Sequence, residues 1–212
     1  MGEYSKALSY YDKALEIKQK TLPSNHSDLV ESYDNIGLLY YNMGEYSTAL
    51  LYYYKALEIK QKTLPSNHPD LAKSYNKIGA VYYNMGEFSR VLSSYKKSLD
   101  IFQRALPPNH PTLGTSYNNI GIVYYYMGEY SNALSFHQKA LEIFKKILPS
   151  NHPDLAVTYG HIGNVYYSVG EYIKALSFFE RAVDVGQGSL SPNHPHLQWY
   201  KNSLEDVKRN CK

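Results

Sequence analysis

The sequence predicts an all-α fold in which antiparallel helix pairs stack into a solenoid. One observation is the phrase Met-Gly-Glu-Tyr, which begins, with small changes, at residues 1, 43, 85, 127 and 169. A second phrase, Asn-His, begins at residues 25, 67, 109, 151 and 193. Both phrases step by 42 residues with no insertion or deletion. Self-similarity at a period of about 20–50 residues is the signature of a repeat array whose units stack on their neighbours.

The first half of each repeat predicts a helix, here called helix A. In the repeat that follows His68, apolar side chains recur at helical spacing between Leu71 and Tyr82. Pro69 stands at the first helical position, where its missing N–H costs nothing. Gly86 is the expected end of this helix.

The second half of each repeat predicts helix B, which is antiparallel to helix A. Its apolar positions run from Phe88 to Phe102, and Pro107 and Pro108 stop it. A glycine inside a helix costs about 0.5–1 kcal/mol relative to alanine, so the recurrent Gly79 of helix A indicates a packing demand. We expect the two helix backbones to approach closely there, opposite the small residues of helix B, which are Ala49, Ala56, Ala133, Ala140, Ala175 and Ala182.

The predicted domain organisation is one repeat array over residues 1–212. It consists of an unpaired helix B at 3–21, full repeats at 28–63, 70–105, 112–147 and 154–187, and a C-terminal capping helix at 195–210. In the last helix Glu205 and Lys208 replace the glycine and tyrosine of the other repeats, which is typical of a solubilising cap. The start in mid-repeat is either native or the edge of a fragment of a longer array.

The repeat resembles a known family. The stretch from Tyr75 to Tyr82 (Tyr-x2-Ile-Gly-x2-Tyr), followed by Val91-x3-Tyr95, is similar to the tetratricopeptide pattern W-x2-L-G-x2-Y and A-x3-F. The resemblance implies a tetratricopeptide α-α superhelix. The 42-residue unit and phrases such as His68-Pro69-Asp70 and Ala140-Leu141-Glu142-Ile143 resemble the repeats of kinesin light chains. The same repeat also occurs in nephrocystin-like proteins and beside unrelated catalytic modules.

Composition excludes several classes of function. Lys plus Arg number 22 against 19 Asp plus Glu, so neither a nucleic-acid nor a membrane partner is indicated. Cys211 is the only cysteine, which excludes an internal disulfide and a thiolate metal cluster. No signal peptide or spanning segment is recognisable, and we expect a cytoplasmic protein without a cofactor.

Histidines invite metal and catalytic hypotheses. His26, His68, His110, His152 and His194 each lie on a different repeat, so they cannot share one ion, and hydrogen bonding at helix starts explains them better. His137 occupies the aromatic position of helix B, where we expect a half-buried packed imidazole. A catalytic base would need a partner that the sequence does not offer. No catalytic residue and no metal ligand is therefore predicted.

The predicted site is a peptide-binding groove on the concave face, formed by helix A residues beside the packing stripe. Asparagine can donate to and accept from an extended backbone, and tyrosine adds apolar area with a polar tip. The predicted groove residues are Asn35, Lys73, Asn76, Lys77, Tyr83, Asn84, Asn118, Asn119, Tyr125, Tyr126, Asn164 and Tyr167. In kinesin light chains paired helix A asparagines line the cargo-peptide groove, and Asn118-Asn119 match them.

An alternative for the same face is the carboxylate clamp of chaperone-binding repeats, which Asn35, Lys73 and Lys77 resemble in part. Lysine is a point charge and not a bidentate fork, so the resemblance is incomplete. If it holds, these residues would bind a free acidic C-terminus.

The sequence thus predicts a non-enzymatic scaffold that binds a partner protein or peptide in the concave groove, with a kinesin light chain-like cargo or adaptor role as one possibility. Two alternatives stay open. The chain could be the accessory array of a larger enzyme or signalling ATPase whose catalytic domain lies upstream. It could also be a self-associating structural array, because the open N-terminal end could pair with another copy, although we expect a monomer.

Overall fold

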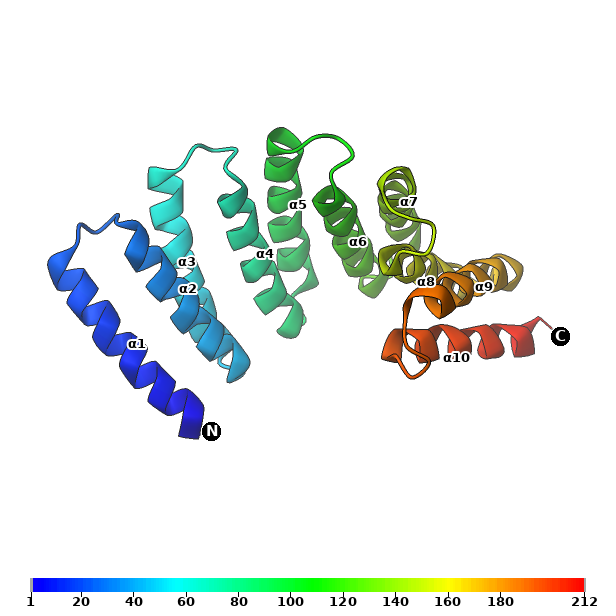
Figure 1. The fold of residues 1–212 in the computed structure, drawn as a ribbon, viewed down its shortest axis with the longest axis horizontal. Helices are drawn as coiled ribbons and strands as arrows, with labels where there is room; N and C mark the ends of the chain where they lie inside the picture. The colour runs from blue at the N-terminus through cyan, green and yellow to red at the C-terminus, as the bar shows by residue number, and fades with distance from the viewer. Residues whose placement is uncertain (1, 212) are drawn as a thin grey trace. The chain divides into compact units, whose positions relative to one another are not determined.

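The structure, a computed structural model, describes residues 2–211, which form ten α-helices and no strand (Figure 1). This confirms the all-α prediction. The five A helices are α2 (Ser27–Asn42), α4 (Pro69–Asn84), α6 (Pro111–Tyr126), α8 (Pro153–Ser168) and α10 (Pro195–Asn210). The five B helices are α1 (Gly2–Thr21), α3 (Tyr46–Thr63), α5 (Phe88–Ala105), α7 (Tyr130–Ile147) and α9 (Tyr172–Ser189).

Contacts between helices group the chain into two compact units. Unit 1 is Met1–Leu106 and unit 2 is Pro107–Lys212. In unit 1 the pairs α2–α3 and α4–α5 pack together, α3 contacts α4, and α1 contacts α2. In unit 2 the pairs α6–α7 and α8–α9 pack together, α7 contacts α8, and α10 contacts both α9 and α8. The single domain over residues 1–212, with its repeat boundaries, stays a prediction.

The five equivalent histidines cap the A helices, as predicted. His68 Nδ1 accepts a hydrogen bond of 3.2 Å from the backbone N–H of Asp70, two residues into the helix. The same bond recurs at the other four sites, His26, His110, His152 and His194. Each imidazole thereby satisfies one of the backbone donors that a helix leaves unpaired at its start.

The turn between helices A and B depends on glycine. Gly86 has a φ of 73°, in the left-handed region that residues with a Cβ rarely adopt. Its N–H bonds to the carbonyl of Tyr83, and the N–H of Glu87 bonds to that of Tyr82, both at 3.0 Å. These bonds satisfy the last carbonyls of α4 and reverse the chain into α5.

The recurrent glycine inside α2, α4, α6 and α8 accommodates an aromatic ring. A Cβ on Gly121 would lie 2.7 Å from the imidazole of His137, and a Cβ on Gly79 would collide with the ring of Tyr95. The predicted packing demand is therefore present. The atoms nearest to the missing Cβ belong to the aromatic side chain of helix B and not to its backbone.

The last A helix contributes three buried side chains to unit 2: Leu197, Tyr200 and Val207. Glu205 is exposed, and its carboxylate lies 3.4 Å from Lys208 Nζ. Helix α10 therefore has one apolar face toward unit 2 and one polar face. Within residues 2–211, no helix combines the length and apolarity that crossing a membrane requires.

Candidate functional site

The structure distributes the predicted groove residues over both units. In unit 1, Lys73, Lys77 and Asn84 are exposed, and the half-buried positions are Asn35, Asn76 and Tyr83. In unit 2, Tyr126 and Tyr167 are exposed, Asn118 is buried, and the half-buried positions are Asn119, Tyr125 and Asn164.

The two lysines of the clamp-like set are already paired within unit 1. Lys77 Nζ lies 3.1 Å from Asp34 Oδ2, which Lys60 Nζ also contacts at 3.0 Å. Lys73 Nζ lies 2.9 Å from Asp70 Oδ1. A partner carboxylate would have to displace these internal ones, and the geometry therefore weighs against a clamp.

Several groove candidates form hydrogen bonds between one helix A and the next, here called tyrosine braces. Asn84 Nδ2 donates to the hydroxyl of Tyr41 at 2.8 Å, across 43 residues of sequence. In unit 2 the hydroxyl of Tyr125 lies 3.1 Å from Ser168 Oγ, and Asn210 Nδ2 donates to the hydroxyl of Tyr167 at 3.3 Å. These tyrosines keep exposed ring surface while their polar tips hold adjacent repeats together.

Asn118 corrects the sequence prediction. It was assigned to the groove, but its side chain is only 7% exposed. Its Nδ2 donates to Thr158 Oγ1 at 2.7 Å, and its Oδ1 lies 2.9 Å from His137 Nδ1. Because the Thr158 hydroxyl donates its one proton to the carbonyl of Asp154 at 2.6 Å, it must accept from Asn118. The amide is therefore an internal link and not a contact for a partner.

His137 is the other end of this link. The orientation of the Asn118 amide requires His137 Nδ1 to donate, so this ring nitrogen carries a proton. The side chain is 1% exposed, where a half-buried one was expected. Burial, and secondarily the neighbouring His161, lowers the pKa of His137 to about 3.

His161 continues the aromatic row from α7 into α8. Its ring stacks on that of His137 with centroids 5.2 Å apart and an interplanar angle of 16°. On the C-terminal side it meets Trp199 of α10, with centroids 5.8 Å apart. Burial, and then the charge that His196 can carry, lowers the pKa of His161 to about 4. Both central imidazoles of the row are therefore uncharged at neutral pH.

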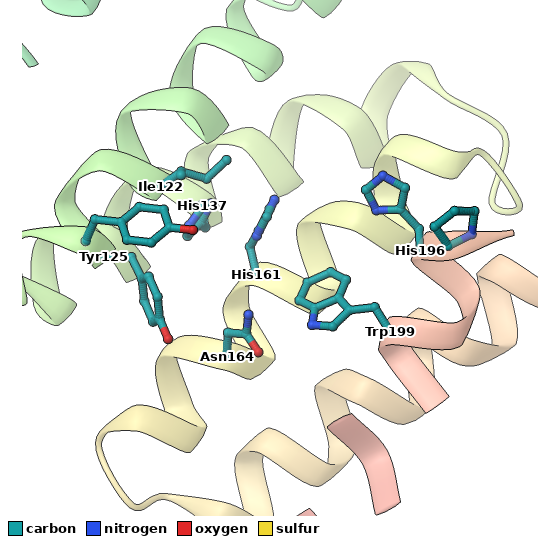
Figure 2. Close-up of a pocket in the computed structure, with 9 residues that line it drawn as sticks. Ile122, Tyr125, His137, His161, Asn164, His196 and Trp199 are labelled. Atoms are coloured by element: carbon teal, nitrogen blue, oxygen red, sulfur yellow. The ribbon is translucent and has the colours of Figure 1, made fainter. Parts of the chain in front are cut away.

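These side chains surround a pocket of about 430 Å³ on the helix A side of unit 2 (Figure 2). In Figure 2 Tyr125 from α6, His161 and Asn164 from α8 and Trp199 from α10 surround one space. The pocket brings together three predicted residues, Tyr125, Tyr126 and Asn164. Sequence reasoning missed the other six, which are Ile122, His137, His161, Pro195, His196 and Trp199.

A signal for the missed residues exists in the repeat itself. His161 stands where the other full repeats have Asn35, Lys77 and Asn119. Gly160 stands where those repeats have Asp or Asn, and a Cβ there would lie 2.9 Å from the Trp199 ring. The departures from the repeat consensus are thus neighbours in space, and together they make room for the pocket.

The polar atoms of the pocket are available for a ligand. Within the described part of the chain the side chains of His161, Asn164 and Trp199 form no hydrogen bond, and none of their nitrogen or oxygen atoms is a buried atom without a partner. A neutral imidazole and an amide each offer a donor and an acceptor, and the indole offers a donor. The site therefore combines aromatic walls with uncharged hydrogen-bonding groups.

Comparisons with known proteins agree with the repeat geometry. One family model, described as tetratricopeptide repeat, matches residues 1–62 and 70–146. A second model with the same description matches residues 155–196. No curated protein is matched by the sequence.

Solved structures are similar in fold. BtubC (BKLC) from P. vanneervenii superposes with a TM-score of 0.82 at 20% identity, over 98% of this chain and 84% of that one. A kinesin light chain with nearly identical TPR-like repeats from Podosopora anserina gives 0.77 at 21% identity, over 90% of each chain. A STAND signal transduction ATPase with a tetratricopeptide repeat sensor from Pyrococcus horikoshii gives 0.71 at 21% identity, over 93% of this chain and 28% of that one. At such identities the likeness shows the fold alone.

Proposed function

The chain belongs to the tetratricopeptide repeat family, and from this premise we propose that it is a non-enzymatic scaffold that holds a segment of a partner protein at the pocket of unit 2. Tetratricopeptide arrays are suited to protein–protein interaction because stacked repeats form extended surfaces. The pocket is the observation that carries the proposal. Its aromatic walls and unpaired polar groups are the composition expected of a recognition site.

The chemistry of the lining favours binding over catalysis. The residues around the pocket are isoleucine, tyrosine, histidine, asparagine, proline and tryptophan, with no serine, cysteine or carboxylate among them. His137 points its Nδ1 proton at Asn118, and no hydroxyl or thiol nucleophile is paired with either central imidazole. The nucleophile, base and oxyanion donors that acyl or phosphoryl transfer needs are not assembled there.

A cargo or adaptor role like that of kinesin light chains is the more specific form of this proposal. The 42-residue repeat and the structural likeness to BtubC (BKLC) and to the Podosopora anserina kinesin light chain support it. The alternative is an accessory array in a larger protein, as in the STAND ATPase, of which the similar region is 28%. Genomic sequence beside the coding region for this chain separates these two, and light scattering tests self-association.

The binding proposal is tested with peptides and a matched pair of variants. Peptides selected from a random library on the whole chain are measured against the double variant His161→Ala/Asn164→Ala. The control is Asn35→Ala/Leu38→Ala, which changes the same two helical positions of α2 in unit 1. We expect the pocket variant to weaken binding at least about tenfold and the control to weaken it less than about twofold, since each lost hydrogen bond contributes about 1 kcal/mol.

Circular dichroism of both variants checks that the helices are retained. If the folded pocket variant binds the peptides as tightly as the parent chain, the partner surface lies elsewhere and the proposal is wrong.

A further inference from the structure

Two of the four helices that line the pocket of unit 2, α6 and α8, are almost free of charged residues. Helix α6 contains no Asp, Glu, Lys or Arg, and α8 contains only Asp154 in its first turn. The A helices of unit 1 differ, since α4 carries Asp70, Lys73 and Lys77. None of the nine residues that line the pocket is Asp, Glu, Lys or Arg. A charged group of a partner would lose water in this pocket and find no carboxylate, ammonium or guanidinium group among the lining residues.

The two central imidazoles of the ring row, His137 and His161, do not supply a positive charge either. His137 and His161 have pKa values lowered to about 3 and about 4, so both are neutral near pH 7. The hydrogen bond between His137 and Asn118 also fixes the row of rings, because His161 stacks on an imidazole that cannot rotate freely. The part of the wall that His137 and His161 form is thus held in place and uncharged before any partner binds.

The polar groups that remain match a peptide backbone. The Asn164 amide presents a donor and an acceptor, as does the neutral His161 ring, and Trp199 presents an N–H. Main-chain N–H and C=O groups are the uncharged polar groups that every protein segment carries. The volume of about 430 Å³ lies at the lower end of ligand pockets, which span about 300–1,000 Å³, so it suits one large side chain and its backbone.

We propose that the pocket of unit 2 binds an uncharged peptide segment, which inserts one aromatic side chain among Tyr125, His161 and Trp199 and pairs its backbone with Asn164. This rests on the proposed function and adds the chemistry of the partner. Aromatic rings prefer tilted or offset contacts with other rings, and the 48° angle between His161 and Trp199 offers faces in two directions. The cost of desolvating a charged group disfavours acidic, basic and phosphorylated segments.

The test uses peptides selected on the whole chain from a random 12-residue phage library at about pH 7.4, and Trp199 is the only tryptophan in the chain. Calorimetry gives the Kd of each synthetic peptide, and Trp199 emission reports whether it occupies the pocket. We expect one recurrent aromatic residue flanked by uncharged residues. Changing that aromatic residue to alanine should weaken binding at least about tenfold. Replacing a flanking residue with Glu or Lys should also weaken it.

Salt dependence is the second readout. Without ion pairs, the Kd should change less than about twofold between about 0.05 M and 0.5 M NaCl. One outcome would overturn this inference and leave the proposed function standing. In it, the selected peptides lose affinity for His161→Ala/Asn164→Ala, but they are rich in charged residues and their binding weakens at least about tenfold in high salt. Peptides whose binding ignores the double variant would overturn both, and so would a library that yields no binder.

Discussion

Acidification should destabilise unit 2 through His137, by an amount that follows from its burial. The folded state holds the pKa of this ring at about 3, against an ordinary value of 6.5. The unfolded chain therefore takes up a proton below about pH 6.5, while the folded chain takes it up only near pH 3, so stability falls as the pH falls through that window. At pH 5 the linkage amounts to about 2 kcal/mol, since each pKa unit corresponds to about 1.36 kcal/mol.

The variant His137→Phe isolates this contribution. Phe179 occupies the same helix B position over Gly163, so a phenyl ring suits this packing. The variant leaves the Oδ1 atom of Asn118 without its partner, and we expect it to be about 1–3 kcal/mol less stable at pH 7. Between pH 7 and pH 5, however, the variant should lose about 2 kcal/mol less free energy of unfolding than the parent, because the other titrating groups are common to both proteins.

Urea unfolding at the two pH values, followed by the emission of Trp199, measures both differences within unit 2. His161 titrates in the same direction in both proteins, since its pKa is lowered to about 4. If the parent and the variant lose the same free energy between pH 7 and pH 5, the burial argument for His137 is refuted.

Three further predictions concern stability, each read from thermal melts followed by circular dichroism. Asn118→Ala should lower the free energy of unfolding by about 1–3 kcal/mol, because it leaves two buried polar neighbours without their hydrogen-bond partner. Asn76→Ala, at the same position of α4, should change it by less than about 0.5 kcal/mol, and equal shifts would contradict the buried link. Gly121→Ala should lower the free energy of unfolding by about 1–3 kcal/mol, because the new Cβ would lie 2.7 Å from the His137 imidazole. Glu205→Ala, at the corresponding exposed position of α10, should leave it nearly unchanged. An unchanged stability for Gly121→Ala would show that the ring moves freely. His152→Ala should cost about 0.5–2 kcal/mol through the lost helix cap, and an unchanged melting temperature would mean that water replaces the imidazole.

The fold could be predicted from the sequence because its determinants are local and recur in phase. Each helix A begins after an Asn-His pair, and α2, α4, α6 and α8 end at a Met-Gly or Val-Gly pair, so one repeat could be checked against the next. The capping histidines followed from the same logic, since the bond from His68 to Asp70 spans two residues. The all-α fold and the histidine caps were thereby confirmed.

The site was harder to predict because it depends on pairs of residues from different helices. Asn118 and Asn119 look alike in sequence, yet only Asn118 faces both Thr158 and His137, and this buries it. Lys77 looked free until the structure placed Asp34 beside it. The periodicity of the sequence does not distinguish such positions. Contacts between residues of different helices, up to a whole repeat apart in sequence, determine which polar side chains remain exposed.

The tyrosine braces bear on how such an array can lengthen or shorten by duplication of its coding sequence. Each brace joins a tyrosine to a polar residue 43 positions later, one more than the repeat length. A duplicated 42-residue block therefore contains both a tyrosine and a polar residue of this kind. Its tyrosine can bond to the polar residue of the following block, and its polar residue can bond to the tyrosine of the preceding block. The pocket of unit 2 has no such freedom, because His137, His161 and Trp199 come from the pair α6–α7, the pair α8–α9 and the single helix α10, and must keep their order. The brace of unit 1, from Tyr41 to Asn84, permits such a change in copy number, whereas a block inserted between α7 and α10 would separate the rings and abolish the pocket.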